Sequence, residues 1–188
     1  MTIKIEKLDT LHKGWNTFSI ATIRLANGDR ISRAIEDHGS AICVLPYDPT
    51  RRVTILVRQF RAPVFATTGQ TDVLEAIAGL IDDEPPEGTA RREAMEEAGL
   101  RLGALEPVSR VWSIPGSSTE RIALFLAPYA AQDRVGDGGG LAHEHENITV
   151  EEIPLAELAR MADAGEIDDL KTLTLVQTLR LRHPALFA

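Results

Sequence analysis

Cysteine is nearly absent from this sequence, since Cys43 is the single example among 188 residues. An intrachain disulfide is therefore excluded. Cys43 lies within the apolar run SAICVLPYD, so we expect its thiol to be buried. Long apolar runs are also missing: no stretch approaches the roughly 18 residues of a membrane-spanning helix, and the segment MTIKIEKLDT lacks the apolar core of a signal peptide. We therefore expect a cytoplasmic protein without a membrane partner.

Positive charge is scarce as well. Twenty Lys and Arg residues stand against 28 Asp and Glu residues, which gives a formal net charge of −8. Such a chain has no long-range positive field to attract a polyanion, so broad binding to nucleic acid is excluded. An anionic substrate would need a local basic pocket or a metal ion. The length and the 44% hydrophobic content are typical of one globular domain, with room for a small extension.

The N-terminal part reads as an antiparallel extension. The segment WNTFSIATIRLANGDRISRAIED alternates polar and apolar residues and predicts two strands joined at Asn27-Gly28-Asp29, because Asn-Gly tolerates the positive φ of a tight turn. Trp15 and Phe18 are expected to pack within these strands, with contact to a nucleobase as the alternative. We assign residues 1–38 to this extension and residues 39–188 to the main domain.

The main domain alternates strands and helices. Strands are expected at SAICVLPYD and RVTILVRQFR, near 105–113, at 121–129 and near 147–153. One helix is expected from the DDEPPEG loop to Ala98, with Gly99 as the left-handed residue after its end, and two more at 154–164 and 168–182. Strands interleaved with helices indicate an α/β fold.

Three glutamates cluster in RREAMEEAGL, residues 91–100. Residues three and four apart share a helix face, so Glu93, Glu96 and Glu97 should converge although like charges at that spacing repel. A solvated acidic face relieved by Arg91 and Arg92 is the simplest interpretation. The alternative is a hard divalent cation, because magnesium prefers carboxylate oxygens and commonly bridges to substrate phosphates.

A family resemblance favours the metal. The segment GLIDDEPPEGTARREAMEEAGL, residues 79–100, resembles the Nudix box, and its second half matches without exception, although Gly79 to Arg92 is one residue shorter than the common spacing. The shortened box is similar to one branch of the Nudix hydrolases, the GDP-mannose pyrophosphatases and the related ADP-ribose pyrophosphatases. Further similar segments are LVRQFR at 56–61, EAIAGL at 75–80, SIPGSSTE at 113–120, GGG at 138–140 and AGEIDDLKTL at 164–173.

The resemblance implies a fold and an activity. The fold would be a Nudix-like α/β/α sandwich with a mixed sheet and an N-terminal antiparallel β extension, in a homodimer that exchanges this extension. The activity would be metal-dependent hydrolysis of the pyrophosphate bond of a nucleoside diphosphate sugar. GDP-mannose, giving GMP and mannose 1-phosphate, is favoured; the alternatives are ADP-ribose, giving AMP and ribose 5-phosphate, and a module that binds nucleotide sugars without cleaving them.

The resemblance also implies roles for individual residues. Glu93 and Glu97 would be the main ligands of Mg²⁺, or alternatively Mn²⁺, with Glu96 and the backbone carbonyl of Ala78 completing the site. Arg92 would orient these glutamates. The substrate would contact Arg61, Glu75, Ser117 and Glu120.

The general base is expected in the segment GLAHEHEN, residues 140–147, where Glu146 is favoured over Glu144. His143 and His145 in the same segment are weak evidence for zinc, because no third ligand lies nearby.

Overall fold

The computed structural model describes residues 2–141 and 147–188 of the protein. The chain divides into two compact units. One consists of Met1–Ser40 and Val111–Ile122, and the other of Ala41–Arg110 and Ala123–Ala188. Each unit is described separately below.

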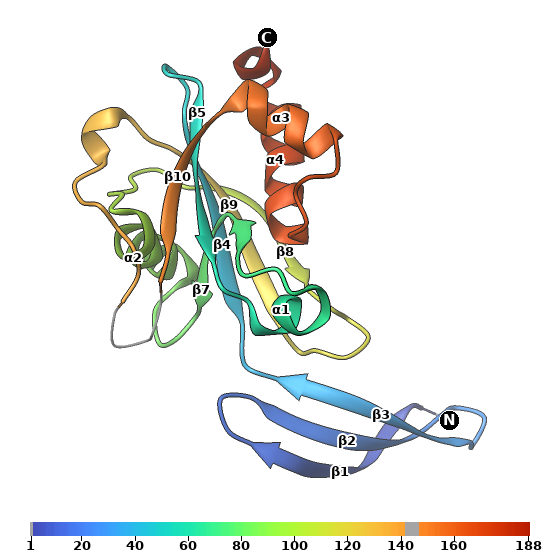
Figure 1. The fold of residues 1–188 in the computed structure, drawn as a ribbon. Helices are drawn as coiled ribbons and strands as arrows, with labels where there is room; N and C mark the ends of the chain where they lie inside the picture. Colours follow the sequence, from blue (N-terminus) through green and yellow to red (C-terminus); the bar gives the residue numbers. More distant parts are fainter. Residues whose placement is uncertain (1, 142–146) are drawn as a thin grey trace. The chain divides into compact units, whose positions relative to one another are not determined.

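The first unit contains a three-stranded antiparallel sheet of β1 (Lys4–Lys13), β2 (Thr17–Arg24) and β3 (Arg30–Asp37), drawn in blue in Figure 1. The turn between β2 and β3 contains Gly28 at φ 95°, as the sequence predicted. Strand β1 was not expected. Two register shifts, between Ile5 and Lys7 and between Thr10 and His12, break the polar and apolar alternation that would have revealed it.

A seven-stranded sheet, most of whose residues belong to the second unit, has the order β10-β5-β4-β9-β8, with β6 paired to β5 and β7 paired to β4. The strands are β4 (Ala41–Asp48), β5 (Val53–Gln59), β6 (Val73–Glu75), β7 (Ile77–Leu80), β8 (Glu106–Trp112), β9 (Arg121–Pro128) and β10 (Thr149–Pro154). Every residue of β4 is buried, as the continuous apolar run predicts for a central strand covered on both faces.

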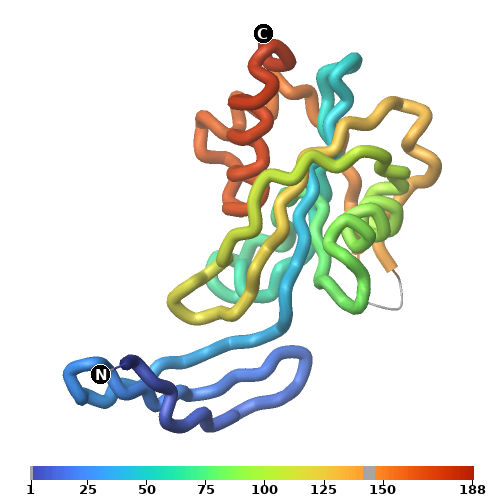
Figure 2. Tube along the Cα trace, turned by 180° about the vertical axis from the view of Figure 1, so that it is seen from behind, coloured from blue at the N-terminus to red at the C-terminus, as the bar shows by residue number. Residues whose placement is uncertain are grey.

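Helices cover both faces of this sheet. Helix α2 (Pro86–Ala98) lies on one face, and α3 (Leu155–Asp163) and α4 (Leu170–Arg182) lie on the other (Figures 1 and 2). Gly99 ends α2 with φ 62°, as expected. The short helix α1 (Ala62–Thr68) was not predicted, and none of its residues is buried. The described residues also include short 3-10 helices, η1 (Ala131–Asp133) and η3 (Pro184–Phe187).

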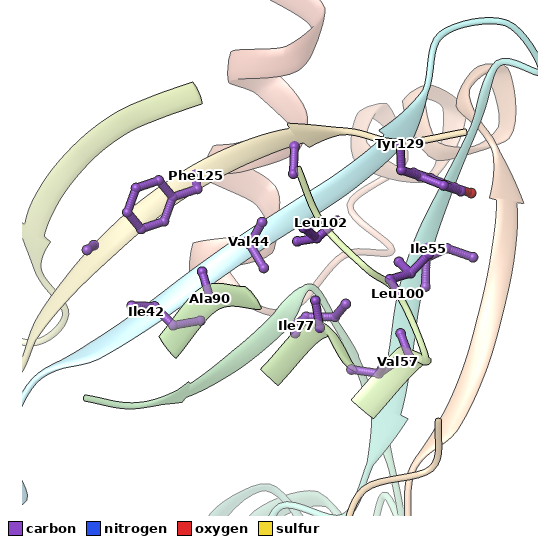
Figure 3. Packing of buried hydrophobic residues seen from close by; sticks show 14 of the residues in the cluster. Ile42, Val44, Ile55, Val57, Ile77, Ala90, Leu100, Leu102, Phe125 and Tyr129 are labelled. Atoms are coloured by element: carbon purple, nitrogen blue, oxygen red, sulfur yellow. The ribbon is translucent and has the colours of Figure 1, made fainter. Parts of the chain in front are cut away.

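A hydrophobic core cluster lies between the sheet and α2. Ile42 of β4, Ile77 of β7 and Ala90 of α2 are fully buried there (Figure 3). Cys43 is buried and unbonded to other sulfur, as predicted, and burial raises the pKa of its thiol. The expected α/β fold with a mixed sheet is confirmed. No helix in the described part of the chain is long and apolar enough to cross a membrane.

Candidate active site

The site begins at a break between two short strands. Strand β6 pairs with β5, and its last residue, Glu75, lies opposite Val57. Strand β7 pairs with β4 instead, where Ala78 lies opposite Cys43. The chain therefore changes partner strand at Ala76, and the residues just before and just after this break are the ones the sequence singled out.

Gly79 provides the space that Glu93 of α2 occupies. A Cβ atom at position 79 would lie 2.0 Å from Glu93 Oε1 and 2.2 Å from its Cδ, far inside normal contact distance. Only glycine allows this close approach of a side chain to the strand. The Glu93 carboxyl group is thereby held directly against β7, next to Ala78.

The three glutamates share α2 but differ in environment. Glu93 and Glu97 are buried, with 9% and 2% of their surface exposed, and Glu96 is half-buried. Arg92 contacts two of them: Nη2 lies 2.9 Å from Glu93 Oε1, and Nη1 donates to Glu96 Oε2 at 2.9 Å. In the described residues, no three acidic, histidine or cysteine side chains are gathered around one point. Arg92 thus takes up part of the negative charge that Glu93 and Glu96 carry.

The donor set nevertheless fits a hard divalent cation. Carboxylate oxygens are the preferred ligands of Mg²⁺, and two of these three carboxylates are buried on the same helix face, four residues apart. The space at Gly79 brings one of them against the strand that carries the Ala78 carbonyl. A cation would relieve the repulsion that burial imposes on this face.

A glycine segment is fastened to the end of α2. Gly139 N donates to the carbonyl of Glu97 at 2.9 Å, and Gly140 N donates to that of Glu96 at 3.1 Å. Gly138 has φ 72°, and a Cβ atom there would lie 2.3 Å from the Glu97 carbonyl oxygen. The glycine segment is therefore hydrogen-bonded to the backbone carbonyls of Glu96 and Glu97. The candidate bases Glu144 and Glu146, with His143 and His145, lie outside the described residues.

Arg61 and Glu75 meet in a bidentate ion pair. Arg61 Nε donates to Glu75 Oε1 at 2.9 Å, and Nη2 donates to Oε2 at 2.7 Å. Lys171 Nζ donates to the same Oε2 at 2.8 Å and to Asp169 Oδ1 at 2.9 Å. Burial would raise the pKa of the Glu75 carboxyl, but Arg61 and Lys171 outweigh it and hold that pKa below its usual range. The Glu75 carboxylate is therefore charged at neutral pH.

Lys171 and Asp169 were not predicted individually as site residues. They belong to the segment AGEIDDLKTL, which was noted only as a resemblance. The sequence did offer one signal for Asp169: it directly precedes a helix, where Asp is a preferred N-cap residue. Lys171 follows on the first turn of the same helix. Lys171 reaches Glu75 from 96 residues away, so the spacing in the sequence could not pair the two side chains.

Ser117 and Glu120 belong to the first unit, where the loop after β8 meets the end of β3. Glu36 N donates to the Ser117 carbonyl at 2.8 Å, and Thr119 N donates to the Glu36 carbonyl at 2.9 Å. His38 lies between two carboxylates, with Nδ1 2.6 Å from Glu36 Oε1 and Nε2 3.2 Å from Glu120 Oε1. The Glu120 carboxylate is therefore already paired in this structure.

The electrostatics around His38 favour its charged form. Burial would lower the pKa of the imidazole, but hydrogen bonds to Glu36 and Glu120 outweigh this effect and raise it. Trp15 stacks on the His38 ring, with centroids 5.0 Å apart and planes at 17°. Trp15 was expected to pack within the strands, but it lies in the bend between β1 and β2 and is 75% exposed.

Comparison with known proteins gives the family. A family model for the NUDIX domain matches residues 37–175. The GDP-mannose pyrophosphatase of Cronobacter sakazakii is 41% identical over 155 residues, which cover 81% of this chain and 80% of that protein. The GDP-mannose pyrophosphatase of Salmonella arizonae is 37% identical over 155 residues, which cover 82% and 80%.

One solved structure supports the same fold. It is described as an ADP compounds hydrolase and aligns with a TM-score of 0.78 at 17% identity, covering 98% of this chain and 96% of that one. At that identity the likeness concerns the fold alone. The family match, the curated relatives and the glutamate helix agree, and the chain belongs to the Nudix family.

Proposed function

We propose that this Nudix hydrolase cleaves the pyrophosphate bond of GDP-mannose with the help of a divalent metal ion, giving GMP and mannose 1-phosphate. The observation that carries the proposal is the pair of buried carboxylates, Glu93 and Glu97, on a helix whose packing against Gly79 brings one of them to the strand edge. The substrate assignment draws on relatives that are named GDP-mannose pyrophosphatases.

In this proposal Glu93 and Glu97 hold Mg²⁺, with Mn²⁺ as the alternative, and Glu96 and the Ala78 carbonyl complete the site. The ion would neutralise the diphosphate and lower the pKa of a bound water. Arg92 restrains the two carboxylates that it contacts, Glu93 and Glu96. The positive charge of Arg92 reduces the repulsion between the Glu93 and Glu96 carboxylates when no metal ion is bound.

Arg61 is proposed to bind the diphosphate. Its planar guanidinium suits bidentate contacts to phosphate oxygens. The Arg61 side chain is 40% exposed, whereas that of its partner Glu75 is 4% exposed, so the arginine has an accessible side while the glutamate anchors it. Ser117 and Glu120 are proposed to contact the nucleoside sugar, which would require Glu120 to exchange its pairing with His38. Glu146, or else Glu144, is proposed as the general base.

The metal assignment is tested by substitution of Glu97. Glu97→Gln keeps the size of the side chain and removes the charge, so we expect turnover to fall by on the order of 10²-fold or more while the protein still folds. Glu87→Gln, in the exposed first turn of the same helix, is the matched control and should turn over like the wild type. Unchanged activity of Glu97→Gln would remove the metal assignment.

The substrate is tested with a panel of GDP-mannose, ADP-ribose, UDP-glucose and a diadenosine polyphosphate, each with Mg²⁺ and with chelator. Preference for GDP-mannose that chelator abolishes is the expected result. Preference for ADP-ribose would keep the mechanism and replace the substrate. Binding of a nucleotide sugar without cleavage of any compound would favour the non-catalytic module.

We also propose that the protein is a cytoplasmic homodimer and that residues 1–38 form its dimerisation part. Strand β1 carries three large apolar side chains that are more than half exposed: Ile5 at 54%, Leu8 at 55% and Leu11 at 65%. Exposed apolar side chains on an edge strand favour pairing with another chain. Light scattering should find a dimer that Leu8→Lys combined with Leu11→Lys converts to monomer, whereas Leu181→Lys on α4 should leave it intact. A monomeric wild type would contradict the proposal.

A further inference from the structure

The break between β6 and β7 leaves a backbone group that the sheet does not satisfy. Ala76 lies between the two strands and is fully buried. A buried N–H group without a partner is costly, so some other part of the protein must accept from it. The acceptor is the hydroxyl of Thr172 on α4, 2.7 Å from Ala76 N.

The hydroxyl of Thr172 is held in the orientation that this contact needs. Thr172 is fully buried, and its Oγ1 donates its own proton to Asp169 Oδ2. Asp169 is the N-cap of α4 and also accepts from Thr172 N at 2.9 Å. With its proton committed to the carboxylate, the hydroxyl presents a lone pair to Ala76 N–H.

The same helix turn also reaches the side chain next to the break. Asp169 accepts from Lys171 Nζ, which donates to Glu75 Oε2 at 2.8 Å. The first turn of α4 therefore holds Glu75 through its carboxylate and Ala76 through its backbone. On one side of these two residues is the Arg61 ion pair, and on the other are Ala78 and Gly79, against which Glu93 lies.

We propose that Thr172 and Asp169 are positioning residues for the active site: they fix the strand break at Ala76, and through it the placement of the Ala78 carbonyl and of Glu93. The role rests on the proposed function. It predicts that loss of the Thr172 hydroxyl affects metal binding and turnover more than the affinity for substrate, because the Arg61, Glu75 and Lys171 contacts remain.

The test compares three variants at one helix. Thr172→Val keeps the shape of the side chain and removes the hydroxyl, and Thr172→Ser keeps the hydroxyl and removes a methyl group. Thr178→Val is the matched control, because the Thr178 hydroxyl donates to the carbonyl of Thr174 in its own helix at 2.8 Å rather than to the strand break. For each, kcat and KM are measured across a Mg²⁺ titration, and Mn²⁺ affinity is measured by electron paramagnetic resonance without substrate.

For Thr172→Val we expect kcat to fall on the order of tenfold and Mn²⁺ affinity to weaken severalfold, with KM changed less than about twofold. Thr172→Ser and Thr178→Val should stay within about twofold of the wild type. If Thr172→Val does not fold, Asp169→Asn is measured instead, because the Asp169 side chain is partly exposed and its carboxylate orients the Thr172 hydroxyl. We expect kcat and Mn²⁺ affinity to fall in the same direction. KM is not used as a readout for this variant, because the substitution also removes the charge that Lys171 contacts.

Three results would overturn the proposal. An active wild type with Thr172→Val indistinguishable from it in kcat and Mn²⁺ affinity would overturn the positioning role alone, and equal losses in Thr172→Val and Thr172→Ser would assign the effect to packing. A wild type that hydrolyses no nucleotide sugar and binds no Mn²⁺ would overturn the proposed function and the role with it.

Discussion

Substitution of Gly79 by alanine isolates the geometry of the glutamate site from the stability of the fold. The backbone of Gly79 does not have the positive φ that disfavours side chains, so alanine is compatible with the strand. The space is the obstacle: the new Cβ atom would lie 2.0 Å from Glu93 Oε1, 2.2 Å from Cδ and 2.7 Å from Cγ. The carboxyl group must therefore leave its place.

The size of this displacement follows from the same distances. Ordinary contact begins at 3.4 Å, so Glu93 Oε1 must move by about 1.4 Å. A misplacement of about 1 Å in a catalytic group can cost on the order of 10²-fold in rate, or about 2.7 kcal/mol of barrier. Stability should change little, because alanine in a strand interior gains roughly 0.5–1 kcal/mol over glycine and so offsets part of the strain.

The assay is kcat for GDP-mannose at saturating Mg²⁺, with thermal unfolding measured in parallel. Gly103→Ala is the control, since a Cβ atom there meets nothing within 4 Å and the backbone is equally permissive. We expect Gly79→Ala to lose about 10²-fold in kcat with a near-native melting temperature, and Gly103→Ala to match the wild type. A Gly79→Ala enzyme within twofold of wild-type kcat would refute the assignment of Glu93 to the metal site.

Two further predictions concern charged groups. The pKa of His38 is raised in the folded protein, so its contribution to stability is fully present below its unfolded pKa of about 6.5 and is lost as pH rises through the higher folded value. Urea unfolding should show His38→Gln destabilised by at most about 1 kcal/mol at pH 6 and by less at pH 9; equal losses at both would contradict the pairing with Glu36 and Glu120. Arg92→Lys keeps the charge but cannot reach two carboxylates with a planar fork, so kcat should fall on the order of tenfold. An unchanged kcat would mean that the fork geometry of Arg92 has no part in placing Glu93 and Glu96.

Local sequence patterns predicted most elements of the second unit. The apolar run of β4, the Gly99 end of α2 and the two C-terminal helices were each found within a few residues, because they depend on side-chain periodicity and on turn residues near in the chain. Strand β1 and helix α1 were missed. Two register shifts disrupt the alternation of polar and apolar residues in β1. Helix α1 has no buried residues, so its sequence carries no periodic apolar pattern.

The sequence by itself determined that Glu93 and Glu97 share a helix face, because four residues make about one helical turn, and that the chain has an α/β fold of the Nudix kind. Only the tertiary structure decided which residues contact that helix and which residues hydrogen-bond to the break between β6 and β7. Glu93 of α2 packs against Gly79 of β7. Thr172 hydrogen-bonds to Ala76, and Lys171 to Glu75, each from 96 positions further along the chain. Such contacts form when distant segments pack to satisfy buried polar groups, and no local pattern records which segments those are.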